Sequence, residues 1–168
     1  MNNIERQKTW IDIFEDPNIS EREKYKYYTQ NDEYVLKLKE KVRQTINQKG
    51  LVSIMNDTKW LKLQHGVQSL PFPPPYIEKL VLEEKSFEEV QISDKPRWFG
   101  DWSPFYQEGM FLFFAIEYIK VRPCYAEHNG RLVAPTIIDE TAAFEQLLQE
   151  LHIPYEEDKG VFIIYGYK

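Results

Sequence analysis

The sequence predicts an α+β fold: a mostly antiparallel sheet of five or six strands with helices packed on it, preceded by a helical N-terminal segment. Two patterns carry this prediction. Residues 111–122 form the longest apolar, β-favouring run, and residues 20–49 carry apolar side chains at helical spacing without a Gly or Pro. A chain of 168 residues can bury a core of its own, so we expect residues 1–50 to be a helical segment and residues 51–168 one compact unit.

The run at residues 111–122 should be the central strand. Up to Ile116 it is apolar on both faces, and such a strand must be covered on both. We expect helices to supply the cover. The pattern changes at Glu117, which could pair with Lys120 or Arg122, the two cations that mark the end of the strand nearest to solvent.

The N-terminal segment should begin with a short helix. Within residues 1–16, Trp10 and Phe14 stand four positions apart and would lie on one helix face. Pro17 should end this helix because proline cannot continue it.

A longer helical stretch should follow. Ser20 and Glu23 fit a capping box at its start, and Gly50 is the expected stop. Residues 29–32, Thr-Gln-Asn-Asp, are poor helix formers, so two helices joined by a turn are expected rather than one.

The compact unit should open with a helix that Asn56 caps and that runs to Leu70. Gly66 weakens this helix and could mark the close approach of another backbone. The proline-rich run at residues 71–75 is an extended spacer that leads to a strand at residues 76–82.

The remaining elements are bounded by turn and cap signals. They are a strand at residues 90–92, a hairpin pairing 125–127 with 131–134 around Asn129-Gly130, a helix capped by Asp139 and closed by Pro154, and strands at 153–156 and 161–165 joined through Gly160. With the two longer strands, these give the expected sheet.

Residues 98–106 form an aromatic segment broken by Gly and Pro, and its rings are the candidate binding residues: Trp98, Trp102, Phe105 and Tyr106. The rings could turn inward as a lid on the sheet, or stay exposed to stack on a protein, a sugar or a base. A carbohydrate site would need at least two of Trp98, Trp102 and Tyr106 in an exposed platform.

Asp101 and Glu117 are weak candidates for a catalytic pair. Two carboxyl groups held about 5 to 10 Å apart can share acid and base work on a glycosidic bond. Each candidate also has a structural explanation, because Asp101 can bond its own loop and Glu117 can pair with a cation. Asp139 is likewise explained as a helix cap. We therefore assign no catalytic residue.

Motifs for metals and common cofactors are missing from the sequence. Cys124 is the only cysteine, and His65, His128 and His152 are widely separated, so no zinc spacing exists and no internal disulfide can form. We expect Cys124 to be a small buried apolar residue. Without a glycine-rich phosphate loop, no cofactor and no metal are expected.

Composition restricts the partners. The chain has 27 acidic and 21 basic residues, a net charge of -6, which does not favour binding to duplex nucleic acid. No apolar run approaches the roughly 18 residues of a membrane-spanning helix. The N-terminus lacks the apolar core of a secretory signal, so we expect no membrane association and a cytoplasmic location.

Several short stretches resemble a family of small bacterial proteins of unknown function. They are Asn56-Asp57-Thr58-Lys59-Trp60, Trp98-Phe99-Gly100-Asp101-Trp102, Ile116-Glu117-Tyr118, Gly130-Arg131-Leu132-Val133-Ala134-Pro135 and Tyr165-Gly166-Tyr167. The resemblance covers roughly residues 51–168. It implies a bacterial, cytoplasmic protein and brings no assigned activity or catalytic residue with it.

These observations favour a non-catalytic protein-binding module over an enzyme. An immunity-type inhibitor, meeting a partner with a basic surface through acidic and aromatic side chains, would fit them. The alternatives are a carboxylate-dependent hydrolase of sugar or phosphoester substrates and a carbohydrate-binding module. The sequence leaves the partner and the oligomeric state open.

Overall fold

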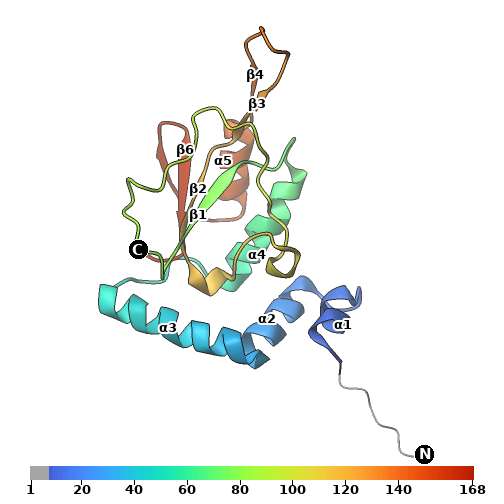
Figure 1. The fold of residues 1–168 in the computed structure, drawn as a ribbon, viewed down its shortest axis with the longest axis vertical. Coiled ribbons are helices and arrows are strands. Elements are labelled where there is room, and N and C mark those ends of the chain that lie inside the picture. The colour runs from blue at the N-terminus through green and yellow to red at the C-terminus, as the bar shows by residue number, and fades with distance from the viewer. Residues whose placement is uncertain (1–7) are drawn as a thin grey trace, which may run out of the picture.

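The computed structural model describes residues 8–168 (Figure 1) and has the predicted α+β class. Its helices are α1 Trp10–Glu15, α2 Glu21–Asn31, α3 Glu33–Lys49, α4 Asp57–Gly66 and α5 Thr141–Glu150. Its strands are β1 Tyr76–Leu80, β2 Ile116–Val121, β3 Cys124–Glu127, β4 Thr136–Asp139, β5 Glu156–Asp158 and β6 Val161–Tyr165. Three short 3-10 turns are η1 Val67–Ser69, η2 Phe105–Gln107 and η3 Phe113–Ala115.

The strands form two antiparallel sheets. The larger sheet has the order β1-β2-β6-β5, so β2 is an interior strand, and β3 and β4 form a separate two-stranded sheet. The expected central strand is shorter than its apolar run, because residues 113–115 form η3 instead of extended chain. That turn places Phe113 and Ala115 in the core under the N-terminal helices.

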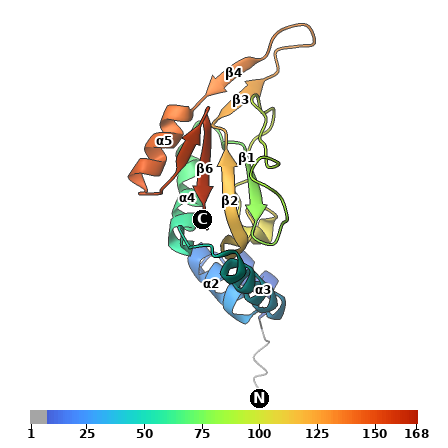
Figure 2. The same cartoon turned by 90° about the vertical axis from the view of Figure 1, so that its left-hand side faces the viewer.

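The sheet is covered by helices on one face only. On that face, Ile119 of β2 and Phe162 of β6 pack in the main core with side chains of α4 and α5. The other face carries Tyr118 and Ile163, which pack against Val90 from the loop after β1. Figure 2 shows α4 and α5 on one side and this loop on the other. The expectation that helices cover both faces was therefore wrong.

Lys120 fixes the covering loop to the sheet. Its Nζ donates hydrogen bonds to the carbonyl oxygens of Phe87 and Val90, at 2.7 and 2.6 Å, and lies 3.6 Å from the centroid of the Phe87 ring. These contacts satisfy a buried cation without a carboxylate. The expected strand at residues 90–92 does not form; this segment is an irregular cover that Lys120 holds in place.

The N-terminal helices agree with their local signals. Ser20 and Glu23 form a capping box, and Asp32 ends α2 while its side chain caps α3. Gly50, with a φ of 66°, ends α3 in the left-handed conformation that favours glycine. The helix predicted before Pro17 is α1.

In the compact unit, Asn56 caps α4 as predicted, but α4 ends at Gly66 and gives way to the η1 turn before the predicted end at Leu70. The close approach at Gly66 is real but of another kind: a Cβ there would lie 3.0 Å from a methyl of Leu147 and 3.1 Å from one of Leu151. The neighbours are α5 side chains, not another backbone. Helix α4 therefore packs directly on α5.

The β3–β4 hairpin differs from its prediction. Strand β3 pairs with residues 136–139, not 131–134, and residues 128–135 form its loop. The Asn129 side-chain amide donates to the carbonyl oxygen of Ala134 and to the hydroxyl of Thr136, at 3.2 and 2.6 Å. Asn129 thus closes a wide loop instead of a two-residue turn.

The C-terminal elements follow the predicted order, but the strand expected at residues 153–156 is β5, Glu156–Asp158. Asp139 accepts a hydrogen bond from the Thr141 backbone N–H at 2.7 Å, although Glu140 occupies the cap position of α5. The β5–β6 hairpin turns at Lys159 and Gly160, both with positive φ, and places β5 at the edge of the larger sheet. Within residues 8–168, no helix combines the length and apolarity needed to cross a lipid bilayer.

Candidate functional site

The aromatic segment at residues 98–106 divides into an exposed and a buried half. Trp98 and Phe99 are 41% and 52% exposed. Trp102 is buried, and its indole N–H donates to the Pro74 carbonyl oxygen at 2.9 Å. Gly100 allows this approach, because a Cβ there would lie 2.1 Å from the same carbonyl.

The other two predicted binding rings lie against the N-terminal helices. Phe105 stacks on Tyr28 with centroids 4.9 Å apart, and Tyr106 stacks on Phe14 at 4.7 Å. Both are half-buried. Of the four candidate rings only Trp98 is exposed, at 41%, so the structure does not bring them together into one stacking platform.

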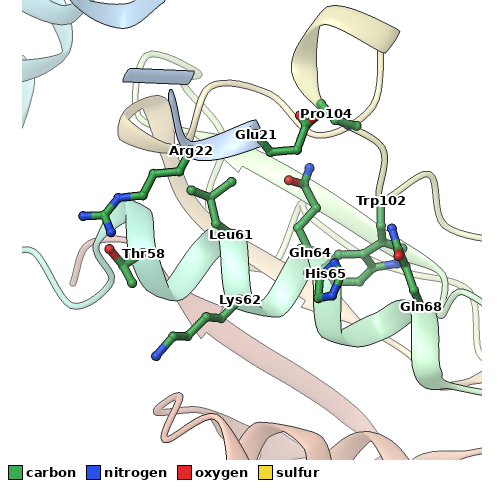
Figure 3. A pocket seen from close by; sticks show the side chains of 10 residues that line it. All are labelled: Glu21, Arg22, Thr58, Leu61, Lys62, Gln64, His65, Gln68, Trp102 and Pro104. Atoms are coloured by element: carbon green, nitrogen blue, oxygen red, sulfur yellow. The ribbon is translucent and has the colours of Figure 1, made fainter. Parts of the chain in front are cut away.

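A groove of about 340 Å³ lies where this segment meets α2 and α4 (Figure 3). Its apolar surface comes from Leu61 of α4 and from Trp102 and Pro104. The Gln64 side chain donates to the Ser103 carbonyl oxygen at 3.0 Å and fixes α4 to the segment. Across the groove, the Tyr106 hydroxyl contacts both carboxylate oxygens of Glu21, at 2.7 and 2.8 Å, and fixes the segment to α2.

Cationic side chains border this groove. Arg22 reaches from α2 toward Thr58 at one end, while His65 and Gln68 lie by Trp102 at the other (Figure 3). Lys62 of α4 lines the same groove. The carboxylate of Glu21 is already held by Tyr106 and by Lys24, whose Nζ lies 3.3 Å away.

A second surface is the β3–β4 hairpin, which projects beyond the rest of the molecule in Figures 1 and 2. Its exposed large apolar side chains are Leu132 at 99%, Val133 at 60%, Ile137 at 42% and Ile138 at 38%. Phe99 lies at its root, 4.5 Å from the ring of Tyr125 in β3. An exposed apolar surface on a projecting element is typical of a contact site.

The two carboxylates considered for catalysis do not face each other. Asp101 accepts hydrogen bonds from the Ser103 backbone N–H, at 3.0 Å, and from its hydroxyl. Glu117 forms an ion pair with Lys79 of β1, in place of the cations on its own strand. The paired register of β1 and β2 skips Glu117, which makes it the extra residue of a β-bulge. We build no catalytic argument on these groups.

Two other carboxyl groups are perturbed by burial. Glu140 is 4% exposed; one of its oxygens accepts from the Phe72 backbone N–H at 3.3 Å, and the other has no partner within residues 8–168. Burial raises the pKa of Glu140 to about 7. Burial also raises the pKa of Glu78 to about 7, although its carboxylate accepts from the Phe111 backbone N–H at 3.0 Å.

The groove was not found by sequence reasoning. Arg22, Leu61 and Lys62 carry ordinary helix patterns, and only Trp102 was singled out. No local signal could have revealed it, because α2 and α4 meet there through tertiary packing. Among residues 8–168, no three His, Cys, Asp or Glu side chains gather in a way that could hold a metal ion.

Comparison with known proteins gives one match. A family model described as "Family of unknown function (DUF6678)" matches residues 42–168, which include the second half of α3 as well as α4, α5 and every strand. No curated protein and no solved structure matches the chain. The matched region contains both the projecting hairpin and the α4 side of the groove, whereas α2 lies outside it.

Proposed function

The chain belongs to the DUF6678 family, whose function is unknown, and we propose that it is a non-catalytic protein-binding module that contacts its partner through the β3–β4 hairpin. The observation that carries this proposal is the apolar surface of that hairpin. Leu132 is 99% exposed at the tip, and burying such a side chain in a partner's pocket is worth about 1.5–3 kcal/mol.

The hairpin suits insertion into a cleft. It is held by its own strand pairing and by the Asn129 amide, so its tip is shaped before a partner arrives. Preorganisation of this kind lowers the entropic cost of binding. Phe99, exposed at the root, adds an aromatic anchor of the kind that interfaces favour.

The charge of the surface next to the hairpin indicates the charge of the proposed partner. Residues 83–97, which cover the outer face of the sheet, contain five acids and three cations, and residues 156–160 contain three acids and one cation. The difference, eight acids less four cations, is a net charge of -4. Asp94 connects this face to the hairpin through Arg122, which precedes β3, at 3.2 Å. The proposed partner therefore has an apolar cleft bordered by basic residues.

A photo-crosslinking residue placed at position 132 tests the proposal in the cells that naturally make the protein. We expect covalent adducts with one protein species from position 132 and none from the matched control at Tyr34, which is 71% exposed on α3. Adducts of equal yield from both positions, or none from position 132, would contradict the proposal.

Variants of this protein, tested for binding to the captured partner, then separate the contribution of the apolar hairpin from that of the acidic surface. Leu132→Asp with Val133→Asp should weaken binding more than about tenfold, because both apolar contacts are lost. Glu88→Lys with Asp158→Lys should instead slow association and reduce its dependence on salt. Retention of tight binding by the hairpin variant would exclude the hairpin as the contact site.

A further inference from the structure

We propose that the groove between α2 and α4 is a second binding site, for a small amphipathic anion that joins a compact apolar body to a carboxylate, sulfonate or phosphate group. The site is distinct from the hairpin and does not depend on the proposed function. Its volume of about 340 Å³ falls within the usual range of roughly 300–1,000 Å³ for small-molecule pockets.

The apolar part of the ligand is inferred from the groove's surface. Leu61, Trp102 and Pro104 supply it from two segments that are distant in sequence. Trp102 is buried, its ring packs on Tyr76 with centroids 4.5 Å apart and its indole N–H is bonded to Pro74, so it adds only a small apolar edge beside Leu61 and Pro104. A compact apolar body complements such a surface.

The charge of the ligand is inferred from the cations of the groove. In the part of the chain that the structure describes, the side chains of Arg22 and Lys62 form no hydrogen bond or ion pair. Among the described residues that line the groove, Glu21 is the only acid, and it is bound to Tyr106 and Lys24. Unpaired cations beside an apolar surface, in a protein of net charge -6, make this groove a local attractor for anions.

The walls of the groove are fixed before a ligand binds. Gln64 bonds α4 to the aromatic segment, and Tyr106 bonds that segment to Glu21 of α2. Arg22 and Lys62 therefore project from two elements that are held together through a third. A preformed site with a few convergent polar groups is the usual form of a small-molecule pocket.

The test uses 8-anilinonaphthalene-1-sulfonate, an aromatic apolar body with one sulfonate, as the probe for the full-length protein. Fluorescence titration should show saturable binding, and NMR shift changes should locate it at Arg22, His65 and Trp102. 1-Naphthoate and 1-naphthyl phosphate should displace the probe and show which anion the site prefers. Displacement of the probe by neutral 1-naphthol should require a concentration about tenfold higher, because this compound lacks a charge-assisted contact.

Four variants make the result specific. Arg22→Gln with Lys62→Gln should raise the Kd of the probe about tenfold or more, whereas Lys41→Gln, an exposed change on α3, should not alter it. Gln68→Trp should block the groove while keeping both cations. Leu132→Asp should leave probe binding unchanged because it alters only the hairpin.

The proposal would be overturned by several outcomes. These are no saturable binding to the unmodified protein, equal displacement by 1-naphthol and the anions, or an unchanged Kd in the Arg22→Gln/Lys62→Gln variant. Loss of probe binding in Leu132→Asp would place the probe on the hairpin and would also overturn it. Circular dichroism and the Tm of each variant identify any variant that fails to fold, and the Arg22→Gln and Lys62→Gln single variants then decide.

Discussion

Strands β2 and β4 are both short and contain two isoleucines each, yet their surroundings are opposite. In β2, five of six residues are buried, and in β4 all four are exposed. β2 lies between β1 and β6, with helices on one face and a loop on the other. β4 pairs only with β3 and carries no covering layer.

This difference shows that apolar content does not decide burial in this protein. Composition gives β4 the character of a strand, and its position on a projecting hairpin leaves the apolar side chains in water. Natural proteins usually protect such an edge because it can pair with other chains. The proposed partner would cover this unprotected apolar edge.

The largest expected effect comes from truncating the buried strand system. Phe162→Ala in β6 removes a ring that is 1% exposed and packs edge-to-face on Phe144, with centroids 5.3 Å apart. Its loss should lower the free energy of unfolding by about 3–5 kcal/mol. Ile138→Ala in β4 should cost about 1 kcal/mol or less. Urea denaturation followed by circular dichroism measures both, and equal losses would show that the hairpin belongs to the core.

An intermediate effect is expected at the buried ion pair. Lys79→Met removes a side chain that is 3% exposed and leaves Glu117, 18% exposed, without its partner. The free energy of unfolding should fall by about 2–3 kcal/mol.

Two comparisons give this experiment its meaning. Lys79→Met with Glu117→Leu should recover part of the loss, because no unpaired charge remains. Arg131→Met, a matched removal of a cation from the hairpin loop, should change stability by about 0.5 kcal/mol or less. If the single and double variants were equally destabilised, packing and not charge would explain the loss.

The smallest expected effect on stability is at Glu140. This buried residue follows exposed Asp139, and the boundary between the projecting hairpin and the covered part of the molecule falls between the two. The pKa of Glu140 is raised from 4.5 to about 7, so the folded protein holds this proton more tightly than the unfolded chain does. Its contribution to stability is complete below pH 4.5 and is lost as the pH rises through about 7.

Glu140→Gln should remove this dependence and reduce the fall in unfolding free energy across that window by about 2 kcal/mol. Part of the fall should remain, because Glu78 has a pKa that is also raised to about 7. Glu127→Gln, at the exposed end of β3, should leave the pH dependence unchanged. Urea titrations at several pH values would contradict the assignment if both variants gave the wild-type slope.

Much of the fold was predictable where the physical cause is local. The capping box of Ser20 and Glu23, the cap at Asn56 and the stop at Gly50 each depend on residues within one helical turn. The aromatic segment was recognised as a feature, and the burial of Trp102 as a lid was one of two predicted outcomes. Local rules could not say that Phe105 and Tyr106 would pack on α1 and α2.

Other predictions failed where long-range pairing decides. Glu117 pairs with Lys79 on the neighbouring strand because a β-bulge redirects its side chain. β3 pairs with residues 136–139 because the Asn129 side chain closes a wider loop than the Asn-Gly signal suggests. The groove at Arg22 and Lys62 has no sequence signal, since it exists only where two helices meet.

The sequence by itself determined the existence of the helices, several of their ends and the existence of an apolar strand at the centre of the chain, because hydrogen bonding and side-chain spacing within a few residues decide these. The tertiary structure decided which apolar side chains are covered, which carboxylates lose water and which cations stay unpaired. Each of those outcomes depends on which side chains from distant segments of the chain lie next to the residue in the folded protein.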